Sequence, residues 1–421
     1  MGRVAGRFRR VEPRRTAREM VAGLASELPA KNCWTLSEHA GHETPDAMQH
    51  LLSRAAWDTD AVRDDLRDYV VESLGDHDAI LVVDESGDLK KGTATVGVQR
   101  QYTGTAGRIE NAQVAVFLSY ATPRGHTFID RSLYLPKSWT SDPERCAEAG
   151  VPEEVEFATK PALAQAMITR ALDAGVPAPW VTGDEVYGAD PKLRAALEAR
   201  GVGYVLAIAC DRRVTTAAGR ARADAVVTAL PRQAWQAISA GHGAKGPRVY
   251  DWVWIGITAD TDDPAPGHRW LLVRRNRVTG ELAYYRCYAA SPVTLAALVS
   301  VAGRRWSIEE DFQSGKGLAG LDQHQVRHWR SWHRWTVLSM LALALLTVLA
   351  AAEHTSQTAP EDLIPLTRNE IRHLTAVLIL HPILDIGHRL RRSLWRRRHQ
   401  HRAKTSHYQR RHAKPPQPAN S

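Results

Sequence analysis

The chain has 421 residues with an ordinary globular composition, 44% hydrophobic and 24% charged, and its formal net charge is +9 at pH 7. The length predicts two or three domains, and the sequence pI near 9.5 favours a polyanionic partner. We expect that partner to be nucleic acid, because no membrane anchor is evident. The N-terminal residues are basic with no apolar stretch behind them, so we do not expect them to be a secretory signal peptide.

Basic residues crowd both ends of the chain. Residues 1–18 are rich in arginine, and residues 389–412 are richer still. Such arms are either solvated and disordered or in contact with nucleic-acid phosphates, and the sequence leaves both interpretations open. Within the tail, Arg396, Arg397 and Arg398 are the candidates for sequence-independent phosphate contacts.

Residues 16–75 are predicted to be helical, because apolar residues recur at spacings near three and four. The pattern breaks before Pro45, which can begin a new helix. Two helices about such a turn, with Arg54, Arg63 and Arg67 nearby, resemble a small helical DNA-binding unit. A packing subdomain is the alternative.

The pattern then changes to strands. Residues 79–83 form a continuous apolar run, as expected of a strand buried on both faces, and the run ends at Asp84. Residues 93–102 and 112–120 complete a predicted three-stranded meander. A polar loop is expected over residues 122–156.

A helix is expected over residues 161–174, and residues 179–184 form another short strand, which ends at Asp184. A helix at residues 191–200 and a strand at residues 204–209 follow. This order of elements predicts a mixed sheet with helices packed on its faces.

Antiparallel strands separate the second aspartate from the next acidic segment. Residues 212–246 are rich in alanine and arginine and are left unassigned. Residues 250–257, 270–275 and 282–288 alternate apolar and polar side chains, as half-buried strands do. We therefore expect a β-rich insertion at about residues 211–292.

Residues 304–316 place acids, bases and aromatics on one predicted helix. Phe312 can face a core, while Arg305 and Glu309, four residues apart, share a neighbouring face. A carboxylate bracketed by Arg305 and Lys316 suits a metal site that also holds phosphate. An amphipathic helix with ordinary ion pairs is the alternative.

Three segments close the chain. The apolar residues 335–351 are too few to span a bilayer and predict a buried core helix. Residues 366–379 predict a helix before the basic tail. Residues 415–418, which are rich in proline, are expected to be disordered.

Three acids are the candidates for catalysis. Asp84 and Asp184 fall where open α/β sheets carry their sites, at the carboxyl ends of buried strands. Glu309, on a later helix, completes a carboxylate site for two Mg2+ ions about 4 Å apart. Each acid alone is weak evidence, because an aspartate after a strand is more often a turn or cap residue. Glu310 is the chief rival of Glu309, but it would point about 100° away around the helix.

Short motifs surround these acids. They are residues 83–87 with Lys90-Lys91-Gly92, residues 101–108, residues 183–188, Arg305-Trp306 through Glu309, Lys316, and residues 320–323. With these motifs the chain resembles an insertion-sequence transposase of the DDE superfamily, in the branch typified by insertion sequence 701. The similarity extends to residues 48–52 and 396–408, and so covers nearly the whole length.

The resemblance implies an RNase H-like core that hydrolyses DNA at transposon ends and then joins the freed 3′-OH groups to target DNA. It makes Asp84, Asp184 and Glu309 the catalytic metal ligands, with Mg2+ as the ion and Mn2+ as a substitute. The residues then expected to hold DNA phosphate near the acids are Arg305, Lys316, Lys90 and Lys91.

Related transposases carry a Y-R-E-K signature around the third acid, and this chain departs from it at Ala302, where the tyrosine is missing. That tyrosine is associated with gripping DNA phosphate at the cleaved end, so the departure puts a hairpin-forming route in doubt. Tryptophans are candidates for stacking on a displaced base, against the alternative that they pack in the core. They are Trp306 and, in the insertion, Trp252, Trp254 and Trp270.

The expected organisation is an N-terminal helical, DNA-binding domain over residues 1–75, a catalytic domain over 76–350, and a C-terminal helix with a basic, partly disordered tail over 351–421. The implied partners are double-stranded DNA of the terminal inverted repeats and target, and a second copy of the chain in the DNA complex, with no membrane. A cytoplasmic, bacterial, nucleoid-associated protein is expected. The alternatives are a catalytically silent DNA-binding relative and a paired-carboxylate hydrolase such as a glycosidase.

Overall fold

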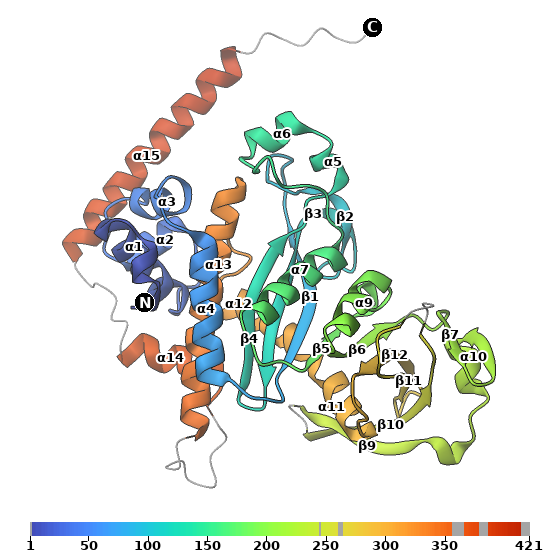
Figure 1. Cartoon of the computed structure of the whole chain (residues 1–421). Helices are drawn as coiled ribbons and strands as arrows, with labels where there is room; N and C mark the ends of the chain where they lie inside the picture. Colours follow the sequence, from blue (N-terminus) through green and yellow to red (C-terminus); the bar gives the residue numbers. More distant parts are fainter. Residues whose placement is uncertain (1, 244–245, 260–263, 356–365, 379–385, 414–421) are drawn as a thin grey trace, which may run out of the picture.

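The computed structural model describes residues 2–243, 246–259, 264–355, 366–378 and 386–413. Its strands are β1 (Ile80–Leu89), β2 (Gln99–Thr103), β3 (Arg108–Thr122), β4 (Gly125–Leu133), β5 (Trp180–Gly183), β6 (Gly203–Ile208), β7 (Arg213–Thr216), β8 (Gly219–Arg222), β9 (Gln236–Gly243), β10 (Gly246–Gly256), β11 (His268–Arg275) and β12 (Leu282–Ala289). Ten of them form one mixed sheet in the order β2-β3-β1-β5-β6-β12-β11-β10-β9, with β4 also paired to β3 (Figure 1).

Five strands make the core around the predicted acids. β1, β3 and β4 are antiparallel neighbours, β5 is parallel to β1, and β6 is parallel to β5. The order β4-β3-β1-β5-β6 is that of an RNase H-like core. The predicted fold class, a mixed sheet with flanking helices, is therefore confirmed.

The predicted meander and the polar loop after it are wrong in detail. β1 pairs with β3 rather than with β2, and β4 lies within the expected loop, followed by α5 (Lys137–Thr140) and α6 (Pro143–Glu148). β4 lacks an obvious strand pattern because it carries Asp130 and Arg131, which are only 4% and 3% exposed and lie in ion pairs.

The inserted segment extends the core sheet. β12 pairs antiparallel with β6, and β11, β10 and β9 continue outward from it. The residues left unassigned form the separate β7-β8 hairpin, α10 (Ala223–Thr228), a 3-10 turn (Arg232–Ala234) and β9. The insertion and the strands that carry the acids thus belong to one continuous β-sheet.

Helices cover both faces of the core. Glu85 of β1 pairs with Lys160 of α7 (Lys160–Asp173), whereas the neighbouring Asp84 faces α12 (Ser307–Ala319). Successive residues of a strand point to opposite faces, so α7 and α12 lie on opposite sides of the sheet. α8 (Glu185–Gly188) and α9 (Pro191–Ala199) follow β5, and α11 (Leu295–Arg304) contacts β5, β6 and β9.

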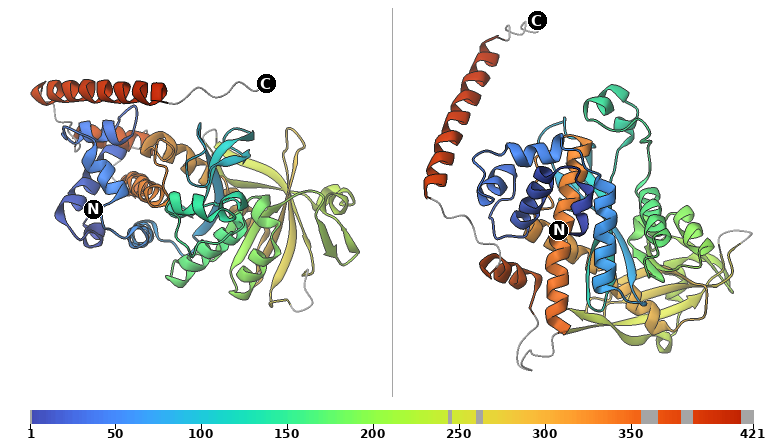
Figure 2. Two further views of the ribbon diagram at one scale, coloured as in Figure 1. Left: turned by 90° about the horizontal axis from the view of Figure 1, so that it is seen from above. Right: turned by 60° about the vertical axis from the view of Figure 1, so that its left-hand side comes forward.

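The N-terminal residues form a short 3-10 helix (Arg3–Arg7) and then α1 (Val11–Leu24), α2 (Cys33–His39), α3 (Asp46–Ser53) and α4 (Thr59–Leu74). These helices and the inserted strands lie at opposite ends of the molecule (Figure 2). Between the helices and β4 runs α13 (Trp329–Thr355), which contacts α1, α4 and β4. α13 is long and apolar enough to cross a bilayer, but 78% of its most apolar window is buried, so the predicted core helix is confirmed.

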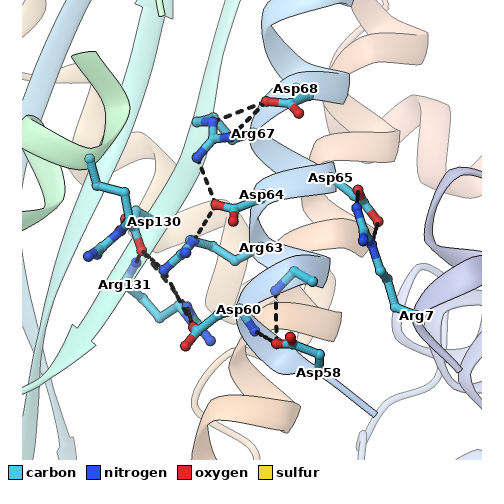
Figure 3. Close-up of polar contacts among 12 residues, drawn as sticks. Arg7, Asp58, Asp60, Arg63, Asp64, Asp65, Arg67, Asp68, Asp130 and Arg131 are labelled. Atoms are coloured by element: carbon cyan, nitrogen blue, oxygen red, sulfur yellow. Dashed lines mark hydrogen bonds and ion pairs between the residues drawn. The ribbon is translucent and has the colours of Figure 1, made fainter. Parts of the chain in front are cut away.

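A series of arginine–aspartate ion pairs runs along α4 and connects it to β4 (Figure 3). Arg63 lies within ion-pair distance of Asp60 and of Asp130 on β4, and Arg67 pairs with two aspartates of its own helix. The side chains of both arginines are at most 10% exposed. The prediction that Arg63 and Arg67 serve a DNA-binding turn is therefore corrected: Arg63 packs α4 onto β4 and Arg67 pairs within α4, while Arg54 stays exposed.

Two helices follow α13 in the part of the chain that the structure describes. They are α14 (Arg368–Leu378) and α15 (Ile386–Ala413), which includes most of the basic tail. Arg392 of α15 donates hydrogen bonds to the carbonyl oxygens of Trp34 and His42, and the Trp395 ring lies 5.3 Å from that of Trp34. α15 therefore docks on α2 by a few side chains. The predicted disorder at residues 415–418 lies outside the described residues.

Candidate active site

Backbone register brings two of the predicted acids together. In the parallel ladder of β1 and β5 the last partners are Val83 and Gly183, so Asp84 and Asp184 are the next residue on each strand. β5 ends there, but β1 stays paired with β3 as far as Leu89. The prediction that Asp84 ends its strand is therefore wrong: it lies inside β1, where only the parallel pairing stops.

Local hydrogen bonds orient both carboxylates. Asp84 is 8% exposed, and its Oδ1 accepts a hydrogen bond from the backbone N–H of Glu85 at 2.8 Å. Asp184 caps the N-terminus of α8, where its Oδ1 accepts from the backbone N–H of Val186 at 2.9 Å. The side chain at each position is thus held by a main-chain donor.

Burial and mutual repulsion act on these acids. Burial, and then the charges of Asp184, Glu85 and Glu309, raise the pKa of Asp84 well above its usual value. Burial and Glu85 likewise raise the pKa of Asp184, against backbone hydrogen bonds and Arg305, which lower it. Crowded carboxylates of this kind are stabilised by a cation between them.

α12 brings the third acid over the sheet. Phe312 packs against Phe117 and Phe128, with ring centroids 5.5 and 5.2 Å apart, and Phe117 is the ladder partner of Asp84. Glu309 lies one turn before Phe312, on the adjoining face of α12, and its charge acts on Asp84. Its rival Glu310 points elsewhere and pairs with His126 at 3.2 Å.

The single helix predicted over residues 304–316 is interrupted. α11 ends at Arg304 and α12 begins at Ser307, so Arg305 and Trp306 form the turn between them. The break follows Gly303, whose carbonyl accepts a hydrogen bond from Arg248 of β10 rather than only from its own helix. The turn directs Arg305 toward the acids, with its Nη1 3.8 Å from Asp84 Oδ2.

The other predicted phosphate contacts divide into two places. Lys90 and Lys316 lie near Asp88, further along β1, and Lys90 Nζ is 4.0 Å from its Oδ2. Burial raises the pKa of Asp88, but His324, Lys90 and Lys316 outweigh it and lower that pKa. Lys91 is exposed on the same loop as Lys90. The three arginines of α15 are exposed beside the N-terminal helices, away from the acids (Figure 1). They are Arg396, Arg397 and Arg398.

The candidate tryptophans differ in availability. Trp252 is 1% exposed and donates its indole N–H to the Ile238 carbonyl, so it is a core residue and the stacking prediction is corrected for it. Trp254 and Trp270 stack on each other with centroids 5.4 Å apart. Trp306 is 52% exposed. Of the four, Trp306 is the most exposed.

Sequence reasoning missed several groups at this site. Glu85 is held by Lys160 at 2.5 Å and by the Tyr187 hydroxyl at 2.7 Å, and His324 contacts Asp88 at 3.0 Å. The position of Glu85 next to Asp84 in the sequence could have predicted that it lies near the site. Nothing in the sequence predicted Lys160 or His324 there, because their partners Glu85 and Asp88 are distant in sequence.

A cavity of about 750 Å3 opens beside Asp184. Arg305 and Trp306 line it on the side of the acids, and β9 to β12 line it on the other side. Its walls are rich in aromatic and basic side chains, in contrast to the cluster of acids next to it.

The donor set fits hard divalent ions, since Asp84, Asp184 and Glu309 offer only carboxylate oxygens. Among the described residues, the group with ligand atoms within 4.8 Å of one another is Asp76, His77 and Asp78, in the loop before β1. The three predicted acids are not in such a group, so in this structure their carboxylate oxygens are not all within 4.8 Å of one another.

The fold and the paired acids define an RNase H-like nuclease architecture, and the sequence comparisons agree. The family described as "DDE superfamily endonuclease" matches residues 3–239, more than half of the chain. The chain belongs to this DDE endonuclease family. The matched segment contains Asp84 and Asp184 and ends before Glu309.

Individual proteins are also similar. The chain is 29% identical over 213 residues to a protein of Microchaete diplosiphon named "Probable transposase for insertion sequence element IS701", and the match covers 50% of each chain. The similarity thus spans about half the length of this curated relative. A piggyBac transposase, solved as a synaptic complex with hairpin DNA, is similar with 10% identity and a TM-score of 0.41, over 90% of this chain and 75% of that one.

Proposed function

We propose that this protein is a DNA transposase that cuts phosphodiester bonds at the ends of a mobile element and transfers the freed 3′-OH ends into target DNA. The observation that carries the proposal is the register that sets Asp84 beside Asp184, with Glu309 above them on α12. Family membership supports DNA as the substrate.

In this proposal Asp84, Asp184 and Glu309 hold divalent metal, with Mg2+ as the ion and Mn2+ as a substitute. Two bound ions would supply Lewis-acid stabilisation of the charge that develops on the reacting phosphate. The raised pKa of Asp84 supports this role, because burial and then the neighbouring carboxylates raise it, and a bound cation stabilises the charged form against both.

The cations around the acids would position the DNA strand. Arg305, between α11 and α12, would hold the phosphate next to the cleaved bond, and Lys316 and Lys90 would hold phosphates along β1. Trp306, with its exposed ring at the rim of the cavity, would stack on an unpaired base.

DNA outside the site would contact the N-terminal helices and α15, with Arg396, Arg397 and Arg398 adding sequence-independent affinity. Because two ends must be cut and joined together, we propose two copies of the chain in the DNA complex. The mass of that complex tests this: one protomer joining two ends would refute it.

The test of the function is cleavage of DNA that carries the element's own ends, with Mg2+, with Mn2+ and with neither. Wild type should cut only with metal, and Asp84→Asn, Asp184→Asn and Glu309→Gln should each reduce the rate at least about a thousandfold. Glu310→Gln is the matched control and should stay within a few-fold, because Glu310 pairs with His126. Binding to the ends without cutting under either metal would instead indicate a catalytically silent DNA-binding protein.

A further inference from the structure

The wall of the cavity opposite the acids is formed by side chains of the inserted strands, and the proposed role of the acids does not involve them. Strand register puts Tyr285 of β12 opposite Ala207 of β6, and Arg274 of β11 opposite Trp252 of β10. All of these residues line the cavity together with Asp184. The inserted strands and the acids therefore share one face of the sheet.

Arg274 packs on an aromatic ring. Its guanidinium carbon lies 4.7 Å from the centre of the Tyr250 ring, and its buried Nε has no hydrogen-bond partner. Among the residues that the structure describes, no carboxylate pairs with Arg274. Its neighbour Arg275, on the opposite face of β11, shows the usual alternative and pairs with Asp251 at 3.0 Å.

Arg248 adds a second unneutralised charge to the same wall. It donates to the carbonyls of Ala240 and Gly303 at 3.3 and 3.2 Å, and its buried Nε is unpartnered. The backbone of α11 approaches that of β9 closely here. This approach requires glycine at 303, since a Cβ there would lie 2.1 Å from the Ala240 oxygen. No carboxylate within the described ranges pairs with Arg248 either.

Two guanidiniums without acid partners, in a partly enclosed and aromatic-walled space, attract an anion. A planar guanidinium stacked on a tyrosine ring keeps its N–H groups aimed at one position, which suits phosphate oxygens. Three strand spacings separate β5 from β11, about 14 Å, so the anion here is distinct from one bound at Asp84 and Asp184.

We propose that Arg274 and Arg248 form a phosphate subsite for a DNA strand that also passes the acids, at a phosphate beyond the one next to the cleaved bond. The identity of the strand rests on the proposed function, whereas the affinity for phosphate does not. Its source is either the 5′-terminal phosphate of a cut strand or an internal phosphodiester, since both present the same oxygens to the guanidiniums.

The test is binding of short fluorescent single-stranded oligonucleotides to the full-length protein in EDTA, where no cutting occurs. One oligonucleotide carries a 5′-phosphate and the other a 5′-hydroxyl. Arg274→Gln and Arg248→Gln should each weaken binding about tenfold and reduce the slope of log affinity against log salt by about one. Arg220→Gln removes an exposed arginine from β8, away from the cavity, and should stay within about twofold of wild type.

The two oligonucleotides identify the source. A loss confined to the 5′-phosphorylated strand indicates the terminal phosphate, and an equal loss for both indicates an internal phosphodiester. Arg274→Lys keeps the charge and should keep the salt slope. The proposal is overturned if Arg274→Gln and Arg248→Gln behave like Arg220→Gln, or if Arg274→Lys loses as much as Arg274→Gln, because packing would then explain the effect.

This outcome is separate from that of the cleavage test. A protein that binds through Arg274 but never cuts DNA keeps the subsite and refutes the catalytic proposal. If the protein cuts DNA with metal while its Arg274→Gln variant binds like wild type, the catalytic proposal is kept and the subsite is refuted.

Discussion

Val83 and Gly183 are direct partners at the last step of the parallel ladder between β1 and β5, and this pairing makes neighbours of the two acids that follow them. The proximity of Asp84 to Asp184 is thus imposed by the backbone, whatever the charge on the side chains. Burial, and then the charge of Asp184, raise the pKa of Asp84 above its usual value.

We expect Asp84→Asn to raise the free energy of unfolding of the metal-free protein by about 1–2 kcal/mol near neutral pH. The folded-state pKa of Asp84 lies above its unfolded value, so the penalty is fully present above the folded pKa and disappears as the carboxyl is protonated. The gain should therefore vanish in acid. Chemical denaturation in EDTA at two pH values measures it. Asp68→Asn, at an exposed position, is the control, and a less stable Asp84→Asn variant would contradict the explanation.

His126 should make stability depend on pH in the opposite sense. Burial lowers its pKa, but Asp311 and Glu310, at 2.8 and 3.2 Å, outweigh burial and raise it to about 9. The contribution of this imidazolium is fully present below the unfolded pKa of about 6.5 and is lost as the pH rises through about 9. Wild type should lose on the order of 2–3 kcal/mol across that window relative to His126→Gln. Parallel stability curves for the two proteins would exclude this role.

Replacing Arg396, Arg397 and Arg398 together by alanine should weaken DNA binding equally for all sequences. Each lost phosphate contact lowers the slope of log affinity against log salt by about 0.9, so the slope should fall by two to three, as about that many contacts are lost. Filter binding over a salt series measures it. The triple alanine variant of Arg212, Arg213 and Arg220, exposed near the β7-β8 hairpin, removes the same charge and should leave the slope nearly unchanged. Equal slopes for the two triple variants would show that α15 makes no special contact.

Asp130→Ala should destabilise the protein by about 3–5 kcal/mol, because it leaves buried cations on α4 and β4 without their shared acid. Asp130 is 4% exposed and lies within ion-pair distance of Arg63, Arg131 and Arg170. Thermal unfolding at a single pH is sufficient to measure the effect. Asp68→Ala, on the same network but at the surface, should cost less than about 0.5 kcal/mol. A small effect at Asp130 would mean that packing alone holds α4 to the sheet.

The sequence by itself determined the elements that carry the predicted acids. A continuous apolar run marks a strand buried on both faces and leads directly into Asp84, and a short strand likewise leads into Asp184. The spacing of Phe312 and Glu309 likewise places one in the core and the other on the adjoining face of α12. These patterns are local, and the motifs around them are specific enough to indicate the family.

Only the tertiary structure decided what these local patterns could not encode. β4 escaped prediction because Asp130 and Arg131 look like loop residues until their partners from α4 and α7 are in place. Arg274 and Arg275 are indistinguishable in sequence, yet one meets Asp251 and the other faces the cavity without an acid. The reason is that alternate residues of a strand enter different layers, and the charge that each layer offers comes from segments far away in the chain.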